Sequence, residues 1–343
     1  MKFGPVRIEE SVGGILAHSV KRDGLVLKKG ETLTRDHVAA LQAAGVSDVV
    51  VAQLEDGDIG EDDAAARLAQ AVAGENVRVD QAFTGRANLF AECAGVLVAD
   101  PALIDAINAV DEQVTIATLP AFRTLVPGEM IATVKVIPFA VPSRIVDAAI
   151  AAARGASLRV AAFAPLRIGV ASTLLPGLKP STVDKTLRVM QERVAPAGAS
   201  IVGDLRVAHD TPALERALNR LRHECDLIVV FGASAITDRR DVIPAALLAA
   251  GGRIEHFGMP VDPGNLLLIG ELDGKPVLGA PGCARSPKEN GFDWVLHRML
   301  AKLPVRSADI RRMGSGGLLM EIVSRPQPRL GDAPLAGDAP GDE

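Results

Sequence analysis

The sequence predicts an α/β protein whose C-terminal domain is a three-layer α/β/α structure with a mostly parallel sheet. From about residue 165 onward, apolar strand-like segments alternate with helical segments, which is typical of a parallel sheet covered by helices on both faces. Before that point strand-like segments follow one another more closely, which predicts a smaller α+β module and a strand-rich module. The length of 343 residues suits about two or three domains.

The first module, residues 1–74, is predicted to be a small α+β unit. Thr34 is a residue type that caps helices and Gly45 is one that ends them, so the segment between them is predicted as a helix. A strand is predicted at 48–53, where the sequence reads DVVVAQ, and a second helix is predicted to end at Gly74.

The second module, residues 75–156, is predicted to be strand-rich. A helical stretch joins its strand-like segments, and Pro101 stands at the first helical position, where proline is favoured. The alanine-rich stretch at about 143–156 is predicted as a connecting helix. The strand-like segments are VRV, GVLVA, QVTIATL and MIATVKVIPFAV.

The third segment, residues 157–305, is predicted to be the α/β domain. Ser181 is predicted to cap its first helix, and Thr211 with Pro212 to open its second. The pair Asp273–Gly274 predicts a turn between two strands. The predicted strands are RIGVAST, ASIVG, CDLIVVFG, RIEHFG and the two halves of NLLLIGELDGKPVLGAP.

A strong helix signal lies near the end of this domain. Ser286, Pro287 and Glu289 have the spacing of a capping box with proline at the first helical position. Residues 306–330 are predicted to add a strand through the segment GGLLMEIV, and the Gly, Pro and Asp-rich residues 331–343 are predicted to be a disordered tail. The apolar residues that follow the helical period are Phe292, Val295, Leu296, Met299, Leu300 and Leu303.

Composition and charge argue against several classes of partner. Lys and Arg number 37 against 42 Asp and Glu, a formal charge of −5, so the chain lacks the basic character of nucleic-acid-binding proteins. Nine Phe, one Trp and no Tyr offer few stacking platforms. The N-terminal residues lack the apolar region of a signal peptide, and no uncharged run reaches the ~18 residues of a membrane span. We therefore expect a cytoplasmic protein with no nucleic-acid and no membrane partner.

Two familiar catalytic motifs are incomplete. Gly232 begins a segment like the nucleophile elbow of serine hydrolases, but Ile236 stands where the second glycine belongs. The run from Gly270 to Lys275 is short for a phosphate-binding P-loop, and Pro276 replaces the hydroxyl residue that holds Mg²⁺. Neither chemistry is predicted.

Four loops are predicted to meet at one edge of the parallel sheet. In such folds ligands bind outside the carboxyl ends of the strands, where loops lead into helix N-termini. A helix N-terminus offers free N–H donors and a positive dipole end, so residues 282–286 are predicted to hold a phosphate. The candidate ligand-binding residues are Ser172, Thr173, Gly232, Ala233, Ser234, Arg240, Pro281, Gly282, Cys283, Arg285 and Ser286.

Three aspartates in these loops are candidate metal ligands. Mg²⁺ usually takes one or two carboxylates together with substrate phosphates and waters, and Asp210, Asp238 and Asp241 are the carboxylates available. Asp241 also has a structural interpretation, because it stands where a residue would cap the following helix. The loops together favour a site for a phosphorylated small molecule with a divalent ion.

Two of these loops resemble a known family. The segment GASAITDRRDVIPAAL resembles the glycine-rich loop of the molybdopterin-binding domain in molybdenum-cofactor biosynthesis proteins of the MogA and MoeA kind, and PVLGAPGCARSP resembles its LPGNPxS loop. The resemblance covers about residues 165–305, and the first 160 residues are similar to the companion region of bacterial molybdopterin-binding proteins. In the two loops, Ala233 replaces the second glycine, and Cys283–Ala284 replace Asn-Pro.

The resemblance implies a protein that binds molybdopterin or adenylyl-molybdopterin with Mg²⁺ in cofactor assembly. Asp210 and Asp241 match the family's acidic pair, which implies a catalytic role in a molybdotransferase or an adenylyltransferase-like enzyme. Two alternatives stay open: a non-catalytic molybdenum-cofactor carrier or sensor, and an unrelated phosphate-ligand binder. The resemblance also implies a homo-oligomer, with a cofactor-biosynthesis protein or a molybdoenzyme as partner.

Overall fold

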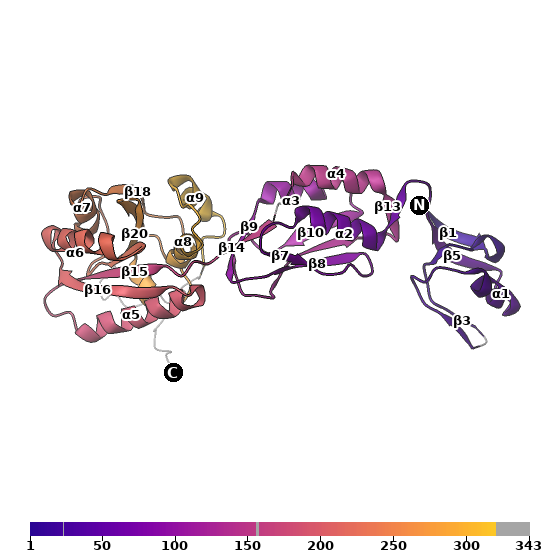
Figure 1. Cartoon of the computed structure of the whole chain (residues 1–343), viewed down its shortest axis with the longest axis horizontal. Helices are drawn as coiled ribbons and strands as arrows, with labels where there is room; N and C mark the ends of the chain where they lie inside the picture. The colour runs from indigo at the N-terminus through magenta and orange to yellow at the C-terminus, as the bar shows by residue number, and fades with distance from the viewer. Residues whose placement is uncertain (23, 156–157, 320–343) are drawn as a thin grey trace, which may run out of the picture. The chain divides into compact units, whose positions relative to one another are not determined.

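The computed structural model describes residues 1–22, 24–155 and 158–319, and Figure 1 labels its elements. The described residues form two compact units, each built from separate stretches of the chain. Among them, no helix combines the length and the apolar character that a membrane span needs. The first unit comprises Met1–Ile168, Met190–Val202 and Trp294–Val305; the second comprises Gly169–Val189, Gly203–Asp293 and the described residues from Arg306.

The N-terminal part of the first unit is a small α+β structure, as predicted. Its elements are β1 (Lys2–Arg7), β2 (Ile15–Leu16), β3 (Val20–Arg22), β4 (Leu25–Leu27), α1 (Arg35–Ala43) and β5 (Asp48–Gln53). The strands β1, β5 and β2 form an antiparallel sheet with β5 at its centre. Thr34 caps α1 as predicted, because its Oγ1 accepts a hydrogen bond from the His37 N–H at 3.2 Å.

The next part of the first unit is rich in strands, as predicted. Its main antiparallel sheet has the order β10 (Val114–Thr118), β12 (Met130–Val136), β8 (Arg86–Ala91) and β7 (Val77–Val79). Smaller sheets pair β11 (Thr124–Leu125), β9 (Gly95–Ala99) and β14 (Leu158–Ala162), and β6 (Asp58–Gly60) with β13 (Ala140–Pro142). The helices are α2 (Glu61–Val72), α3 (Pro101–Asn108) and α4 (Ser143–Ala153).

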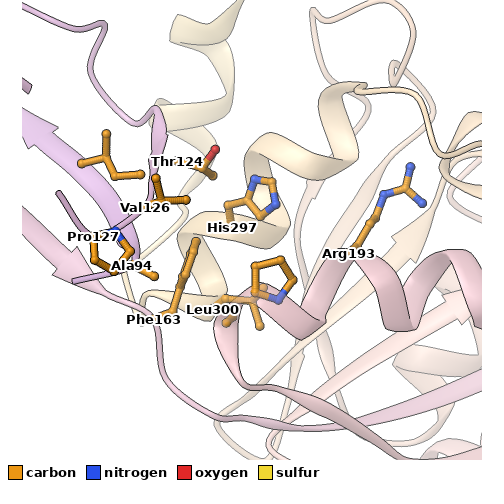
Figure 2. A pocket seen from close by; sticks show the side chains of 11 residues that line it. Ala94, Thr124, Val126, Pro127, Phe163, Arg193, His297 and Leu300 are labelled. Carbon is orange, nitrogen blue, oxygen red and sulfur yellow. The ribbon is translucent and has the colours of Figure 1, made fainter. Parts of the chain in front are cut away.

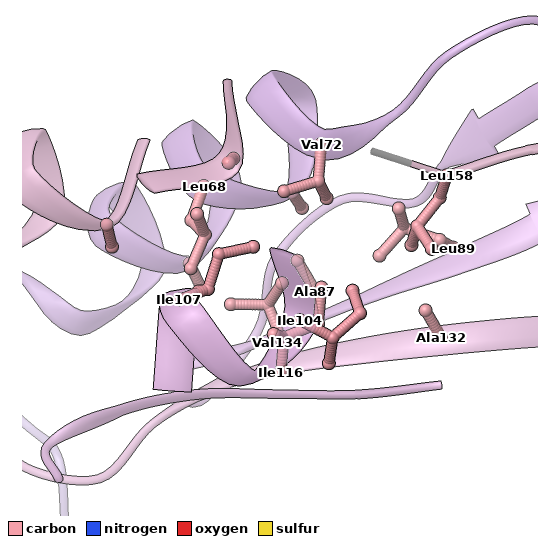
Figure 3. Close-up of a cluster of buried hydrophobic side chains, with 14 of the residues drawn as sticks. Leu68, Val72, Ala87, Leu89, Ile104, Ile107, Ile116, Ala132, Val134 and Leu158 are labelled. Carbon is pink, nitrogen blue, oxygen red and sulfur yellow. The ribbon is translucent and has the colours of Figure 1, made fainter. Parts of the chain in front are cut away.

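This part has a hydrophobic core of its own (Figure 3). Leu68 and Val72 of α2 pack with Leu89 of β8, and Ile107 of α3 joins them from the side of β10. Each of these four side chains is fully buried. Burial of this kind, at about 25 cal/mol per Å² of apolar surface, supplies the main favourable free energy of a domain.

Most of the second unit is built on a six-stranded sheet. Its strands are β15 (Arg167–Leu174), β16 (Ser200–Ala208), β17 (Leu227–Phe231), β18 (Arg253–Phe257), β19 (Leu268–Leu272) and β20 (Lys275–Ala280). Their order is β16-β15-β17-β20-β19-β18. β17 and β20 are parallel, whereas β19 runs antiparallel to both of its neighbours. The sheet is therefore mostly parallel, and β17, β18 and β20 point the same way.

Helices cover both faces of this sheet, which confirms the predicted three layers. They are α5 (Pro180–Val194), α6 (Thr211–Glu224), α7 (Val242–Ala249) and α8 (Gly291–Leu300). On one face, Leu218 of α6 and Leu247 of α7 pack with Val230 of β17. On the other face, α5 lies across β15 and β16 from α6 (Figure 1), and Phe292 of α8 contacts Phe231.

Two predicted helix starts are wrong. α5 begins at Pro180, so Ser181 lies inside the helix; proline fits the first helical position because its φ is already helical. The capping box at Ser286 and Glu289 is absent, because α8 begins only at Gly291. There Asn290 makes the cap: its Oδ1 accepts from the Phe292 N–H at 3.1 Å, and its own N–H donates to an Asp293 carboxylate oxygen at 2.8 Å.

The last residues that the structure describes differ in secondary structure from the prediction. Two short helical turns, α9 (Ser307–Arg311) and Arg312–Gly314, precede the expected strand GGLLMEIV. Leu318 makes an isolated bridge to Asp262. The rest of that expected strand and the predicted tail 331–343 lie outside the described residues. β14 pairs with β9, although the predicted module boundary at 156 separates them; the full division into modules stays a prediction.

Candidate functional site

The carboxyl ends of the central strands lie together at one edge of the six-stranded sheet. The His209 N–H donates to the Leu174 carbonyl at 3.0 Å, which joins the ends of β16 and β15. Phe231 pairs with Ala280, which joins the ends of β17 and β20. The loops that carry the candidate residues therefore leave the sheet side by side, as the strand pattern predicted.

Thr173 connects the β15 end to the loop after β17. Its side chain is 1% exposed, and its Oγ1 accepts a hydrogen bond from the Ala233 N–H at 2.8 Å. The same oxygen lies 2.8 Å from Nδ1 of His209. Thr173, Gly232 and Ala233 are thus brought together, but the Ala233 N–H already has an acceptor and is not free for a ligand.

Arg285 lies at the centre of this arrangement. Its Nη1 donates to Thr186 Oγ1 at 2.8 Å, its Nη2 donates to the Gly232 carbonyl at 2.9 Å, and its guanidinium carbon lies 5.4 Å from the centre of the Phe231 ring. Burial lowers the pKa of this guanidinium, which remains charged at neutral pH. Among the described residues no carboxylate pairs with it, so a half-buried positive charge faces the site without a counter-ion.

Ser172 lies on the same face of the sheet as Arg285. Successive side chains of a strand point to opposite faces, and Ala171 and Val230 face α6 and α7; Ser172 and Phe231 therefore face the other way, where Arg285 stacks. The Ser172 hydroxyl is buried and has no hydrogen-bond partner among the described residues. A buried hydroxyl in this state costs about 1–3 kcal/mol, so it is a natural contact for a ligand.

Each of the three aspartates has a local structural role. Asp210 caps α6, accepting from the Ala213 N–H at 2.8 Å. Asp241 caps α7, accepting from the Val242 N–H at 2.7 Å. Asp238 pairs with Arg240, whose guanidinium lowers the pKa of that carboxyl. In the described part of the chain, no three His, Cys, Asp or Glu side chains group to hold a metal ion, and magnesium binding stays a prediction.

The loop after β20 differs from its predicted form. Residues 282–285 form a single 3₁₀ turn, and Ser286 follows in an extended conformation with φ −90° and ψ 146°. No α-helix begins here, so the predicted helix dipole is absent from residues 282–286. This loop contributes the side chain of Arg285 to the site. Arg240, in the loop after β17, has a side chain that is 92% exposed. The ligand contacts proposed for Ser234, Pro281, Gly282, Cys283 and Ser286 remain predictions.

Two glycines of the site have different surroundings, and we expect different results from alanine substitution. A Cβ on Gly232 would lie 2.6 Å from the Ser234 carbonyl oxygen, whereas a Cβ on Gly282 meets nothing within 4 Å. We expect Gly232→Ala to lower the free energy of unfolding by about 1–3 kcal/mol through overpacking, and Gly282→Ala to change it by less than about 0.5 kcal/mol. Urea unfolding followed by fluorescence measures both; equal losses would contradict the assignment.

A separate cavity of about 400 Å³ lies in the first unit (Figure 2). Phe163 and His297 lie side by side in its wall, with ring centres 6.1 Å apart. None of the predicted site residues lines this cavity. Its lining residues are Ala94, Thr124, Leu125, Val126, Pro127, Phe163, Arg193, Pro196, Ala197, His297 and Leu300.

The sequence prediction missed two residues of the site. The Thr186 hydroxyl accepts a hydrogen bond from Arg285, and the His209 ring contacts the Thr173 hydroxyl. Neither Thr186 nor His209 was among the predicted ligand-binding residues. Thr186 carries a detectable signal: it stands between Val183 and Met190 on the apolar face of a helix, where a buried threonine needs a partner. His209 lies at a strand end beside Asp210, where the sequence suggested a loop only.

The fold and the site define a class: a three-layer α/β/α domain with a half-buried cation at the carboxyl edge of its sheet. Residues 168–302 match the family model described as a probable molybdopterin binding domain. The match confirms the resemblance to molybdenum-cofactor biosynthesis proteins. Residues 5–53 match a model described as a domain of unknown function.

Solved structures similar to this chain carry related names. The molybdopterin biosynthesis MoeA protein of Pyrococcus horikoshii is 13% identical, with a TM-score of 0.31, over 88% of this chain and 75% of that one. A molybdenum cofactor biosynthesis protein B is 17% identical, with a TM-score of 0.30, over 40% of this chain and 96% of that one. The resemblance of residues 168–302 to this family is carried by the sequence match. No curated protein gives a significant sequence match.

Proposed function

We propose that residues 168–302 bind molybdopterin or adenylyl-molybdopterin by its phosphate at the carboxyl edge of the sheet. Arg285 is the observation that carries the proposal: a half-buried guanidinium, held in place by Thr186 and Gly232, with no carboxylate partner among the described residues. A fixed guanidinium recognises phosphate because its planar fork of donors matches two phosphate oxygens.

The remaining contacts follow from the same geometry. A guanidinium has five N–H donors, and Thr186 and Gly232 each take one, so the others remain for a ligand. The buried Ser172 hydroxyl lies on the same face and would gain a partner. In the described chain, the loops after β15, β17 and β20 contain no Phe, Trp or Tyr, and the ring of Phe231, at the end of β17, already packs against the Arg285 guanidinium. The flat pterin would therefore be held by backbone, hydroxyl and aliphatic groups.

Binding without chemistry is the form of the proposal that the described residues favour. Asp210 and Asp241 already accept backbone hydrogen bonds, and the described residues do not form a magnesium site by themselves. Mg²⁺ would enter with the ligand phosphates. The second candidate is molybdate insertion or adenylyl transfer, which the presence of both aspartates in the edge loops favours.

Calorimetry of the full chain with adenylyl-molybdopterin, AMP and pyrophosphate tests the proposal. We expect a micromolar or tighter dissociation constant for the pterin phosphate, with weaker binding of the two fragments. Titrations with and without Mg²⁺ show whether the ion enters with the ligand. If none of the three compounds binds in either condition, the proposed function is wrong.

We further propose that the protein acts as a homo-oligomer in the cytoplasm and passes the cofactor to a biosynthesis protein or a molybdoenzyme.

Replacing the two capping aspartates separates their structural role from catalysis. We expect Asp210→Ala and Asp241→Ala each to lower the free energy of unfolding by about 1 kcal/mol, because each removes a helix cap. Asp241→Asn keeps a capping oxygen and should keep most of that stability. Turnover of adenylyl-molybdopterin with molybdate and Mg²⁺ is expected to be no faster in the natural protein than in Asp241→Asn. Turnover that disappears in Asp241→Asn would establish the enzyme instead.

A further inference from the structure

A single peptide unit at the candidate site is held from both ends. The Gly232 carbonyl accepts from Arg285 Nη2 at 2.9 Å, and the N–H of the same peptide unit, that of Ala233, donates to Thr173 Oγ1 at 2.8 Å. A peptide unit is planar, so its carbonyl and N–H turn together. These two hydrogen bonds therefore fix which way the Gly232 carbonyl points.

The Thr173 hydroxyl is held in turn by His209. Since Thr173 Oγ1 accepts the Ala233 N–H, its own proton needs an acceptor, and Nδ1 of His209 lies 2.8 Å away. The Thr173 hydroxyl donates to Nδ1 in the tautomer of His209 that carries no proton on this nitrogen. The backbone of His209 is anchored as well, because its N–H donates to the Leu174 carbonyl at 3.0 Å.

The chain of contacts thus runs from His209 through Thr173 and the 232–233 peptide to Arg285. If the peptide rotated by half a turn, the Ala233 N–H would face the guanidinium, and two donors would oppose each other. Arg285 would then lose its hydrogen bond to the Gly232 carbonyl. Its hydrogen bond to Thr186 does not involve this peptide and would remain. The guanidinium would be less well placed for a phosphate.

We propose that Thr173 and His209 are positioning residues for phosphate binding, acting through the 232–233 peptide on Arg285. This inference rests on the proposed function. Neither side chain needs to touch the ligand: the effect on affinity arises from the direction of one carbonyl group. The inference therefore predicts that the contribution of Thr173 depends on the presence of Arg285.

A double-mutant cycle with pyrophosphate as the probe tests this dependence in the full chain. Thr173→Val removes the hydroxyl at nearly constant shape, and we expect pyrophosphate to bind about tenfold more weakly. Thr173→Ser restores the hydroxyl and should recover most of the affinity. In an Arg285→Ala background, the same Thr173→Val change is expected to have less than about a twofold effect. Thr182→Val, an exposed change on α5, serves as the control.

His209 supplies the second arm of the test. His209→Asn offers an acceptor oxygen near the position of Nδ1, whereas His209→Ala offers none, so the asparagine variant should bind pyrophosphate more tightly than the alanine variant. Equal losses from Thr173→Val in both backgrounds would show a general structural effect and overturn the inference, while the proposed function would stand. Failure of the unmodified protein to bind pyrophosphate and adenylyl-molybdopterin would overturn both.

Discussion

Arg285→Ala is expected to weaken binding of a phosphate-bearing ligand by about 10- to 100-fold. Hydrogen bonds to a charged group contribute about 1.5–3 kcal/mol, and about 1.4 kcal/mol corresponds to a tenfold change in dissociation constant. Arg285→Lys should recover only part of the loss, because an ammonium group cannot reach Thr186, Gly232 and a phosphate as a planar fork does. Calorimetry with adenylyl-molybdopterin and pyrophosphate measures the affinities.

The matched control is Arg240→Ala. Arg240 lies at the same edge of the sheet and carries the same charge, but its side chain is 92% exposed and pairs with Asp238. Exposed ion pairs contribute about 0–1 kcal/mol, so we expect less than about a fivefold change in affinity. If both substitutions weaken binding equally, the ligand responds to general surface charge, and Arg285 does not form a specific site.

The architecture of the domain could be predicted because its signals are local and repeated. Strand and helix segments alternate from β15 to β18, and the Asp273–Gly274 turn between β19 and β20 is where the sequence predicted it. Helix starts were less predictable. Asn290 and Ser286 are both good capping residues, and only the hydrogen bonds that Asn290 makes with Phe292 and Asp293 decide that α8 begins at the later position.

The sequence predicted where the site lies but not which side chains face it. Strand order implies that loops after β15, β16, β17 and β20 meet, and they do. The sequence does not reveal whether a given side chain faces the site or its own backbone. Asp210 and Asp241 have the residue type of metal ligands, yet each bonds to the helix that follows it. Arg240 and Arg285 look equivalent in sequence, and only the structure distinguishes them, by their burial and by their hydrogen-bond partners.

Because aromatic residues are scarce in this chain, the Phe231 ring serves both the hydrophobic core and the candidate site. The side chain is 1% exposed, its ring lies 6.5 Å from that of Phe292, and the guanidinium of Arg285 stacks on it. The same ring therefore fills the core between the sheet and α8 and supports the cation of the site. A change at this position should affect both stability and binding, to degrees that depend on what replaces the ring.

Phe231→Ala is expected to lower the free energy of unfolding by about 3–5 kcal/mol, because it leaves a cavity beside Phe292. Trp294 is the only tryptophan of the chain and lies in α8, so its fluorescence in a urea titration follows the unfolding of this region. Phe83→Ala is the control: that ring is 76% exposed, and its removal should change stability by less than about 0.5 kcal/mol.

Phe231→Leu separates the two roles of the ring. Leucine fills much of the space and should retain most of the stability, but it has no aromatic face for the guanidinium. A cation on an aromatic ring is worth about 0.5–1 kcal/mol, so we expect the variant to bind pyrophosphate about two- to fivefold more weakly while its urea midpoint falls less than that of Phe231→Ala. If Phe231→Leu binds as tightly as the natural protein, Thr186 and the Gly232 carbonyl alone suffice to hold Arg285 in place.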